Sequence, residues 1–110
     1  MAATNASQLD ADGAVLTEVI AMYLDEAARN LNRLKTAVES QDAGEVDRAA
    51  HAFKSASLNV GALQIGELCR KLERQGKAGE LSGAVDLVQA IERQLERVRP
   101  LLLAEMRPVQ

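Results

Sequence analysis

Several residue types are scarce in this 110-residue chain, and each scarcity excludes a class of structure or site. It has one cysteine, Cys69, and one histidine, His51, so an intramolecular disulfide is impossible and a structural metal site lacks ligands. Trp is absent and Tyr and Phe occur once each, a composition that suits packed helices better than a β-sandwich. The formal net charge of -3 leaves no basic excess to meet nucleic-acid phosphates.

Long apolar segments are also missing. Residues 1–10 are small and polar and contain no apolar signal core. No run approaches the ~18 apolar residues of a membrane span. We therefore expect a cytoplasmic, monomeric protein that binds neither membrane nor nucleic acid.

The apolar residues that are present follow a helical period. The first stretch runs from Ala14 to about Ser40. Its apolar residues recur every three or four positions, as in an amphipathic helix: Leu16, Ile20, Tyr23, Ala27, Leu31, Leu34 and Val38. Similar stripes over 42–60, 62–76 and 84–98 predict three further helices. Short connections make these an all-α, antiparallel four-helix bundle over 14–106. Residues 1–13 are expected to form an N-terminal arm that could include a short helical turn, and 107–110 a C-terminal tail.

Capping and helix-breaking residues predict the ends of these helices. Asp42 and Glu45 resemble a capping box at the start of the second helix: the Asp42 side chain can accept from the free amides of the new helix, while the Glu45 side chain reaches back toward Asp42. Gly61 suits a left-handed position after that helix, and the third helix is expected to end near Gly76. Pro100 is expected either to stop the fourth helix or to kink it, because proline lacks an amide donor; in the second case Leu101 to Met106 continue the helix beyond the kink.

The second helix directs its histidine away from the core. The core stripe of that helix comprises Val46, Ala50, Phe53, Ser57 and Val60. At ~100° per residue His51 lies about 140° from Val46, and Lys54 follows one turn later. Lys54 could neutralise a phosphate on the imidazole, a contact worth ~1.5–3 kcal/mol.

The surroundings of the histidine suit a protein partner. The neighbouring Ala52, Ser55 and Ala56 are small and leave the ring accessible. Leu58 is apolar on the exposed side, and Ala62 follows just past the turn, so both could contact a partner protein.

Antiparallel packing across Gly61 brings a carboxylate close to the ring. It places Lys71 to Glu73 near His51, with Glu73 beside the Ile65–Leu68–Leu72 stripe. A carboxylate bonded to Nδ1–H would leave Nε2 as the nucleophile. A solvated Glu73 on an exposed face is the alternative interpretation.

At these residues the sequence resembles the histidine phosphotransfer (HPt) family. The match to the family motif covers the central third of the chain and reads Ala50-His51-Ala52-Phe53-Lys54-Ser55-Ala56-Ser57-Leu58-Asn59-Val60-Gly61-Ala62, then Leu68-Cys69-Arg70-Lys71-Leu72-Glu73. The resemblance implies that His51 is the phosphoacceptor, Lys54 the phosphate-stabilising cation and Glu73 the residue that orients the ring. Ser55 stands where the family often has glycine, and its hydroxyl could contact the phosphoryl group.

The resemblance also implies a reaction and a set of partners. His51 would exchange a phosphoryl group with an aspartate in the receiver domains of a hybrid histidine kinase and a response regulator, in a direction that the sequence leaves open. Mg²⁺ is expected in the receiver and no cofactor in this chain. Without a Gly-rich phosphate loop, autonomous kinase activity is not expected. The alternative is a non-catalytic helical scaffold that binds a partner helix near Leu58 and Ala62.

Overall fold

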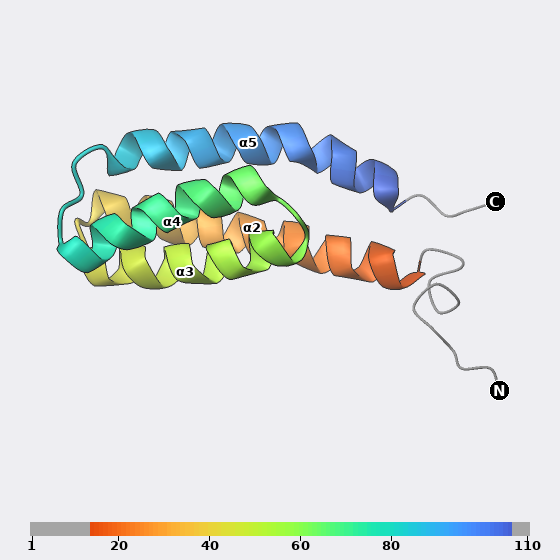
Figure 1. The fold of residues 1–110 in the computed structure, drawn as a ribbon, viewed down its shortest axis with the longest axis horizontal. Coiled ribbons are helices and arrows are strands. Elements are labelled where there is room, and N and C mark those ends of the chain that lie inside the picture. The colour runs from red at the N-terminus through yellow and green to blue at the C-terminus, as the bar shows by residue number, and fades with distance from the viewer. Residues whose placement is uncertain (1–13, 107–110) are drawn as a thin grey trace.

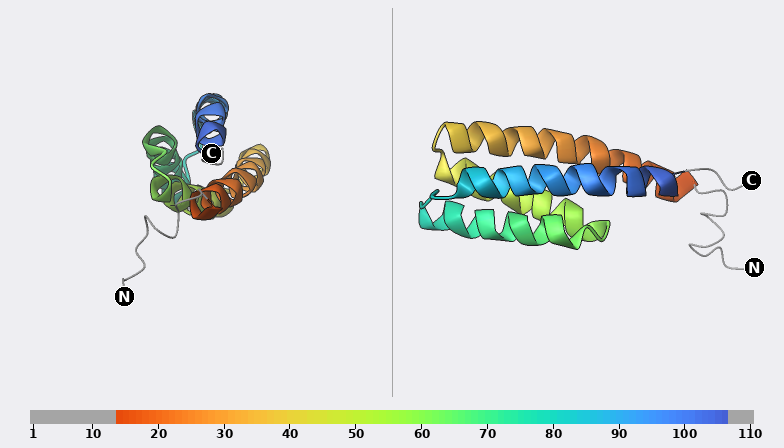
Figure 2. Two further views of the ribbon diagram at one scale, coloured as in Figure 1. Left: turned by 90° about the vertical axis from the view of Figure 1, so that its right-hand side faces the viewer. Right: turned by 90° about the horizontal axis from the view of Figure 1, so that it is seen from above.

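The computed structural model describes residues 14–106. This part of the chain forms four α-helices, connected by short turns: α2 (Ala14–Glu39), α3 (Ala43–Asn59), α4 (Leu63–Ala78) and α5 (Ala84–Glu105). Successive helices run antiparallel and pack as a bundle (Figures 1 and 2). The predicted all-α four-helix bundle is confirmed, whereas the arm expected at 1–13 and the tail expected at 107–110 lie outside the described residues.

The core lies where the apolar stripes of the helices meet. Its largest fully buried side chains, mostly those predicted from the helical period, are Tyr23, Phe53, Leu34, Ile65, Leu72, Ile91, Val46, Cys69 and Ser57. Leu16 was expected in this stripe but is 37% exposed. The reason is visible in Figure 1, where α2 begins and α5 ends beyond the turn between α3 and α4. The first turns of α2 therefore lack the neighbours that cover the rest of the helix.

The start of α3 follows half of the predicted capping box. The Asp42 side chain accepts a hydrogen bond from the Glu45 amide at 3.1 Å, as the sequence pattern indicated. The reciprocal bond was expected from the Glu45 carboxylate, and that expectation was wrong. Its oxygens instead accept from Arg33 Nε at 2.9 Å and from Arg48 Nε at 3.2 Å, because a charged donor is a stronger partner than a backbone amide.

Helix α4 ends just after the expected position. Its end was expected near Gly76, and the helix runs to Ala78 and is capped by Gly79, whose φ of 70° is left-handed. Gly76 itself is buried against α3. A Cβ atom at this position would lie 2.6 Å from the Asp47 amide nitrogen, so the missing side chain lets the two helices approach closely.

Helix α5 passes through Pro100 without stopping. It continues to Glu105, so of the two outcomes expected at Pro100 the stop does not occur, and the segment after the proline remains helical as the second outcome allowed. Proline leaves one carbonyl of the preceding turn without its amide partner, and an exposed position allows water to replace that bond. The last turn is held in place from α2, because Thr17 Oγ1 donates to the Met106 carbonyl at 3.0 Å.

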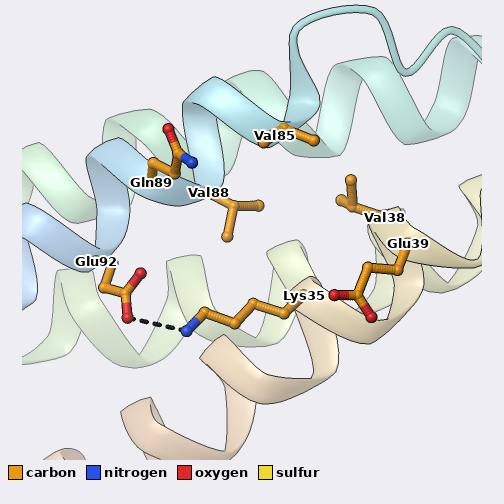
Figure 3. A pocket seen from close by; sticks show the side chains of 7 residues that line it. All are labelled: Lys35, Val38, Glu39, Val85, Val88, Gln89 and Glu92. Atoms are coloured by element: carbon orange, nitrogen blue, oxygen red, sulfur yellow. Dashed lines mark hydrogen bonds and ion pairs between the residues drawn. The ribbon is translucent and has the colours of Figure 1, made fainter.

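A cleft separates part of α2 from α5 on a different side of the bundle from His51. Figure 3 shows Val38 and Val88 facing one another across it, with Val85 at one end. An ion pair between Lys35 Nζ and Glu92 Oε2, 2.9 Å apart, closes the other end. Between residues 14 and 106, no helix has the length and apolar character that crossing a bilayer requires.

Candidate functional site

His51 lies on the outer face of α3, as its projected position indicated. Its side chain is 62% exposed, while Ala50 and Phe53 beside it in the sequence are fully buried. The core residues of α3 therefore fix the rotation of the helix and hold the imidazole in solvent. Within residues 14–106 the ring has one hydrogen-bond partner, which contacts Nδ1 and leaves Nε2 free.

That partner is Glu73 on α4. Its Oε2 lies 2.7 Å from His51 Nδ1, so the carboxylate accepts the Nδ1–H and fixes the tautomer of the neutral ring. Glu73 is only 8% exposed and sits at the junction of α3 and α4, the helices that share the most extensive contact in the bundle. The hairpin argument had placed Glu73 near His51, and the structure brings the two together.

Lys54 belongs to the same network, but its contact differs from the expected one. Its Nζ donates to Glu73 Oε1 at 2.7 Å, and its side chain is 22% exposed. The ammonium group is thus held by the carboxylate that also orients the imidazole. To contact a group on Nε2, Lys54 must share or leave this hydrogen bond.

The hydrogen-bond donors around Glu73 stabilise its ionised form. The hydrogen bond from Lys54 is the main cause that lowers the pKa of the Glu73 carboxyl to about 2. Burial opposes this effect, whereas the His51 hydrogen bond and the charges of Lys54 and Lys77 add to it. Glu73 is therefore a carboxylate throughout the physiological range and always able to accept from the ring.

This lowered pKa has a consequence for the pH dependence of stability. Because the folded-state pKa lies below the ordinary value of 4.5, the ionised group stabilises the fold above that value, and this contribution is lost as the pH falls through about 2. We expect Glu73→Gln to lower the free energy of unfolding by about 1 kcal/mol at pH 7. The difference from the unsubstituted chain should close between pH 4.5 and 2.

Urea denaturation at a series of pH values measures both free energies. Glu67→Gln is the matched control, because Glu67 pairs with Arg70 on the exposed side of the same helix, where an ion pair contributes little to stability. A difference between Glu73→Gln and the unsubstituted chain that persists undiminished at pH 2 would contradict the assignment.

Lys77 and Asp47 join this network although the sequence interpretation did not single them out. Lys77 Nζ donates to Asp47 Oδ1 at 2.8 Å and to Glu73 Oε2 at 3.5 Å. The spacing of Glu73 and Lys77 is i, i+4, which places them on adjacent turns of a helix and could have indicated the contact. Asp47 lies one turn before His51 on α3, so the same projection would have found it.

The other predicted site residues lie around the imidazole without contacting it. Ser55 is exposed, one turn after His51, and Ala52 is half-buried. Leu58 is 48% exposed and lies over Gly66 of α4, where a Cβ would come within 2.7 Å of Leu58 Cδ2. Ala62 is half-buried in the α3–α4 turn and packs against the core.

An apolar groove between α2 and α3 was also missed by the sequence interpretation. It is lined by residues of both helices: Val19, Met22, Tyr23, Glu26, Ala56, Asn59 and Val60. Val19 and Met22 are 45% and 65% exposed. The signal was available in the sequence, because Val15, Val19 and Met22 share a second apolar face of α2 beside the core stripe.

A buried hydrogen bond and a buried thiol beneath the site are structural. The Tyr23 hydroxyl and Ser57 Oγ share a buried hydrogen bond of 2.8 Å, which joins α2 to α3 below the groove. Burial raises the pKa of the Cys69 thiol to about 12, and the nearby Glu73 charge adds to the effect. Cys69 is thus a protonated residue of the core.

The match to known families decides the identity of the bundle. The Hpt domain matches residues 18–100. The chain belongs to the Hpt domain family. An Hpt relative from Arabidopsis thaliana, histidine-containing phosphotransfer protein 4, is 29% identical over 97 residues, which is 86% of this chain and 76% of the relative.

A solved Hpt structure has the same fold. The crystal structure of histidine-containing phosphotransfer protein B (HptB) from Pseudomonas aeruginosa PAO1 superimposes with a TM-score of 0.80 at 30% identity. The alignment covers 82% of this chain and 78% of that one. Both comparisons place this chain among proteins of phosphorelay phosphotransfer, which is the role that the sequence resemblance implied.

Proposed function

We propose that this Hpt chain carries a phosphoryl group on Nε2 of His51, which it receives from a receiver-domain aspartate and passes to another receiver. The observation that carries the proposal is the 2.7 Å contact between His51 Nδ1 and Glu73 Oε2 in a side chain that is 62% exposed. A ring anchored through one nitrogen presents the other to a partner. The carboxylate sets the tautomer in which Nε2 has a free electron pair.

The reaction needs little from this chain besides positioning and charge. The Nε2 electron pair attacks phosphorus, an N–P bond forms, and the bond from phosphorus to the aspartyl oxygen breaks, which leaves the aspartate as a carboxylate. The ring keeps its proton on Nδ1 and so becomes positively charged, and the Glu73 carboxylate stabilises that charge. Lys54, 2.7 Å from Glu73 Oε1, is close enough to turn toward the phosphoryl oxygens. Ser55, exposed one turn after His51, is a further candidate phosphoryl contact.

The partner supplies what this chain lacks. We assign the aspartate, the Mg²⁺ that neutralises the phosphoryl group and their acidic pocket to the receiver domain. The apolar groove that contains Val19 and Met22, together with Leu58, Ala52 and Ala62, forms the docking face around His51 on the Hpt side. Apolar contacts beside a reactive group suit a transient partner that must bind, react and leave.

Transfer of label tests the proposal directly. Incubation with a receiver domain phosphorylated on its aspartate with ³²P is expected to move label to this chain. The product should resist alkali and decompose in acid, as a phosphorus–nitrogen bond does and a phosphoserine ester does not. If several receivers lose their label only by hydrolysis, and none reaches this chain, the proposal fails.

Docking at Leu58 can be separated from docking elsewhere. We expect Leu58→Glu to weaken receiver binding roughly tenfold, because a charge replaces an apolar contact near the centre of the interface. Val85→Glu is the matched control, since Val85 is similarly exposed, at 55% against 48%, but lies at the α2–α5 cleft shown in Figure 3. Isothermal titration calorimetry of each variant with a receiver measures the dissociation constants. Equal losses in both variants would argue against this docking face.

A further inference from the structure

A shallow hollow of about 350 Å³ lies beside the imidazole, lined by Asp47, Arg48, His51, Glu73 and Lys77. Lys54 does not line this hollow. Arg48 does, but its Nε donates to Glu45 at 3.2 Å. The cation that α4 directs to this side of the imidazole is Lys77.

We propose that Lys77 is a second cation for the phosphoryl group on His51. This inference rests on the proposed function and adds a residue to it. Lys77 Nζ lies 3.5 Å from Glu73 Oε2, the same oxygen that is 2.7 Å from His51 Nδ1. The ammonium group of Lys77 therefore shares Oε2 of Glu73 with the imidazole, whereas Lys54 donates to the other oxygen, Oε1.

The charges that line the hollow favour a role for this cation. Two of its lining groups are the carboxylates of Asp47 and Glu73, which would repel the oxygens of an incoming phosphoryl group. Lys77 bridges both carboxylates, at 2.8 Å from Asp47 Oδ1 and 3.5 Å from Glu73 Oε2. With its side chain 61% exposed and a flexible four-carbon stem, the ammonium can turn from Asp47 to a phosphoryl oxygen. Only hydrogen bonds are exchanged in this movement.

The packing of α4 on α3 places Lys77 at this position. Gly76 precedes it, and the absence of a Cβ there brings the α4 backbone against Asp47 and Ala43 of α3. The Lys77 stem therefore starts at the helix junction, close enough for its ammonium to reach across to α3. By contrast, Lys71 and Arg74 on the same helix have no hydrogen bond to α3 within residues 14–106 and are exposed.

The test compares Lys77→Ala with Lys71→Ala, which removes the same charge from the same helix away from the hollow. Two rates are measured: label transfer from a phosphorylated receiver, and hydrolysis of the phosphohistidine in the isolated chain. Lys77→Ala is expected to slow transfer roughly tenfold, the loss of one charge-assisted contact, and to shorten the phosphohistidine lifetime. Lys71→Ala should match the unsubstituted chain, and Lys77→Arg should restore most of both properties.

Asp47→Asn distinguishes a cation from a helix staple. If Lys77 acts on the phosphoryl group, loss of the Asp47 charge frees the ammonium, and transfer should be unchanged or faster. If Lys77 only joins α4 to α3 through Asp47, then Asp47→Asn should slow transfer as Lys77→Ala does, and the inference is overturned. Equal transfer rates and lifetimes in Lys77→Ala and Lys71→Ala would also overturn it. Failure of the unsubstituted chain to accept label would instead count against the proposed function.

Discussion

Replacement of His51 by Gln is expected to abolish phosphoryl acceptance and to leave the fold intact. An amide nitrogen has no free electron pair comparable to that of Nε2, so no stable N–P bond can form. The imidazole is 62% exposed and contributes nothing to the core, and Gln is well tolerated in helices. We therefore expect labelling from a phosphorylated receiver to fall to background while the free energy of unfolding changes by about 0.5 kcal/mol or less.

Labelling and circular dichroism of the same preparation measure the two effects. Arg93→Gln on α5 is a suitable control, because it introduces the same side chain at an exposed position of another helix. It should accept label at the rate of the unsubstituted chain. Undiminished labelling of His51→Gln would place the acceptor at another residue and would contradict the role proposed for His51.

Replacement of Gly76 by Ala is expected both to destabilise the bundle and to slow phosphoryl transfer. The new Cβ would lie 2.6 Å from the Asp47 amide nitrogen and 2.7 Å from the Ala43 carbonyl oxygen. Both are backbone atoms of a packed helix and cannot rotate away, so α3 and α4 must separate. Overpacking of this kind costs ~1–3 kcal/mol, which corresponds to a fall in Tm of about 4–8 °C per kcal/mol in a domain of this size.

Two other glycines provide graded controls for this substitution. At Gly44 the nearest atom to a new Cβ is Arg48 Nη1 at 3.5 Å, an ordinary contact, so Ala should stabilise the helix slightly. At Gly66 the obstacle is the tip of Leu58 at 2.7 Å, which can change rotamer because it is exposed. The expected order of Tm is Gly44→Ala highest, Gly66→Ala intermediate and Gly76→Ala lowest. A Gly76→Ala variant as stable as Gly44→Ala would refute the close approach.

The sequence was sufficient for the bundle and for the central pair of the candidate site. Helical spacing decided which face of α3 is buried, so it also decided that His51 points outward. The turn at Gly61 then aligned Glu73 with His51, because antiparallel helices joined by a short turn leave little freedom of register. Both conclusions depend on regularities that act along a whole helix.

The features that the sequence could not predict depend on contacts between individual atoms of different helices. Glycine is common at helix ends, so the sequence indicated a helix end near Gly76. Only the position of Asp47 in the structure shows that Gly76 allows two helices to pack closely. Glu45 had several possible donors, and its choice of Arg33 over the backbone depends on α2 lying alongside. The exposed position of Pro100, where a lost hydrogen bond can be replaced by water, likewise follows from tertiary structure.

The reactive groups all belong to one helical hairpin. Asp47, His51 and Lys54 come from α3, and Glu73 and Lys77 come from α4. Helix α2 adds an apolar wall to the docking groove but no ionisable contact to the imidazole, and α5 adds neither. If the receiver docks at this groove as we propose, substitutions at Val19 and Met22 on α2 would change receiver preference while leaving every hydrogen bond of the α3–α4 hairpin in place.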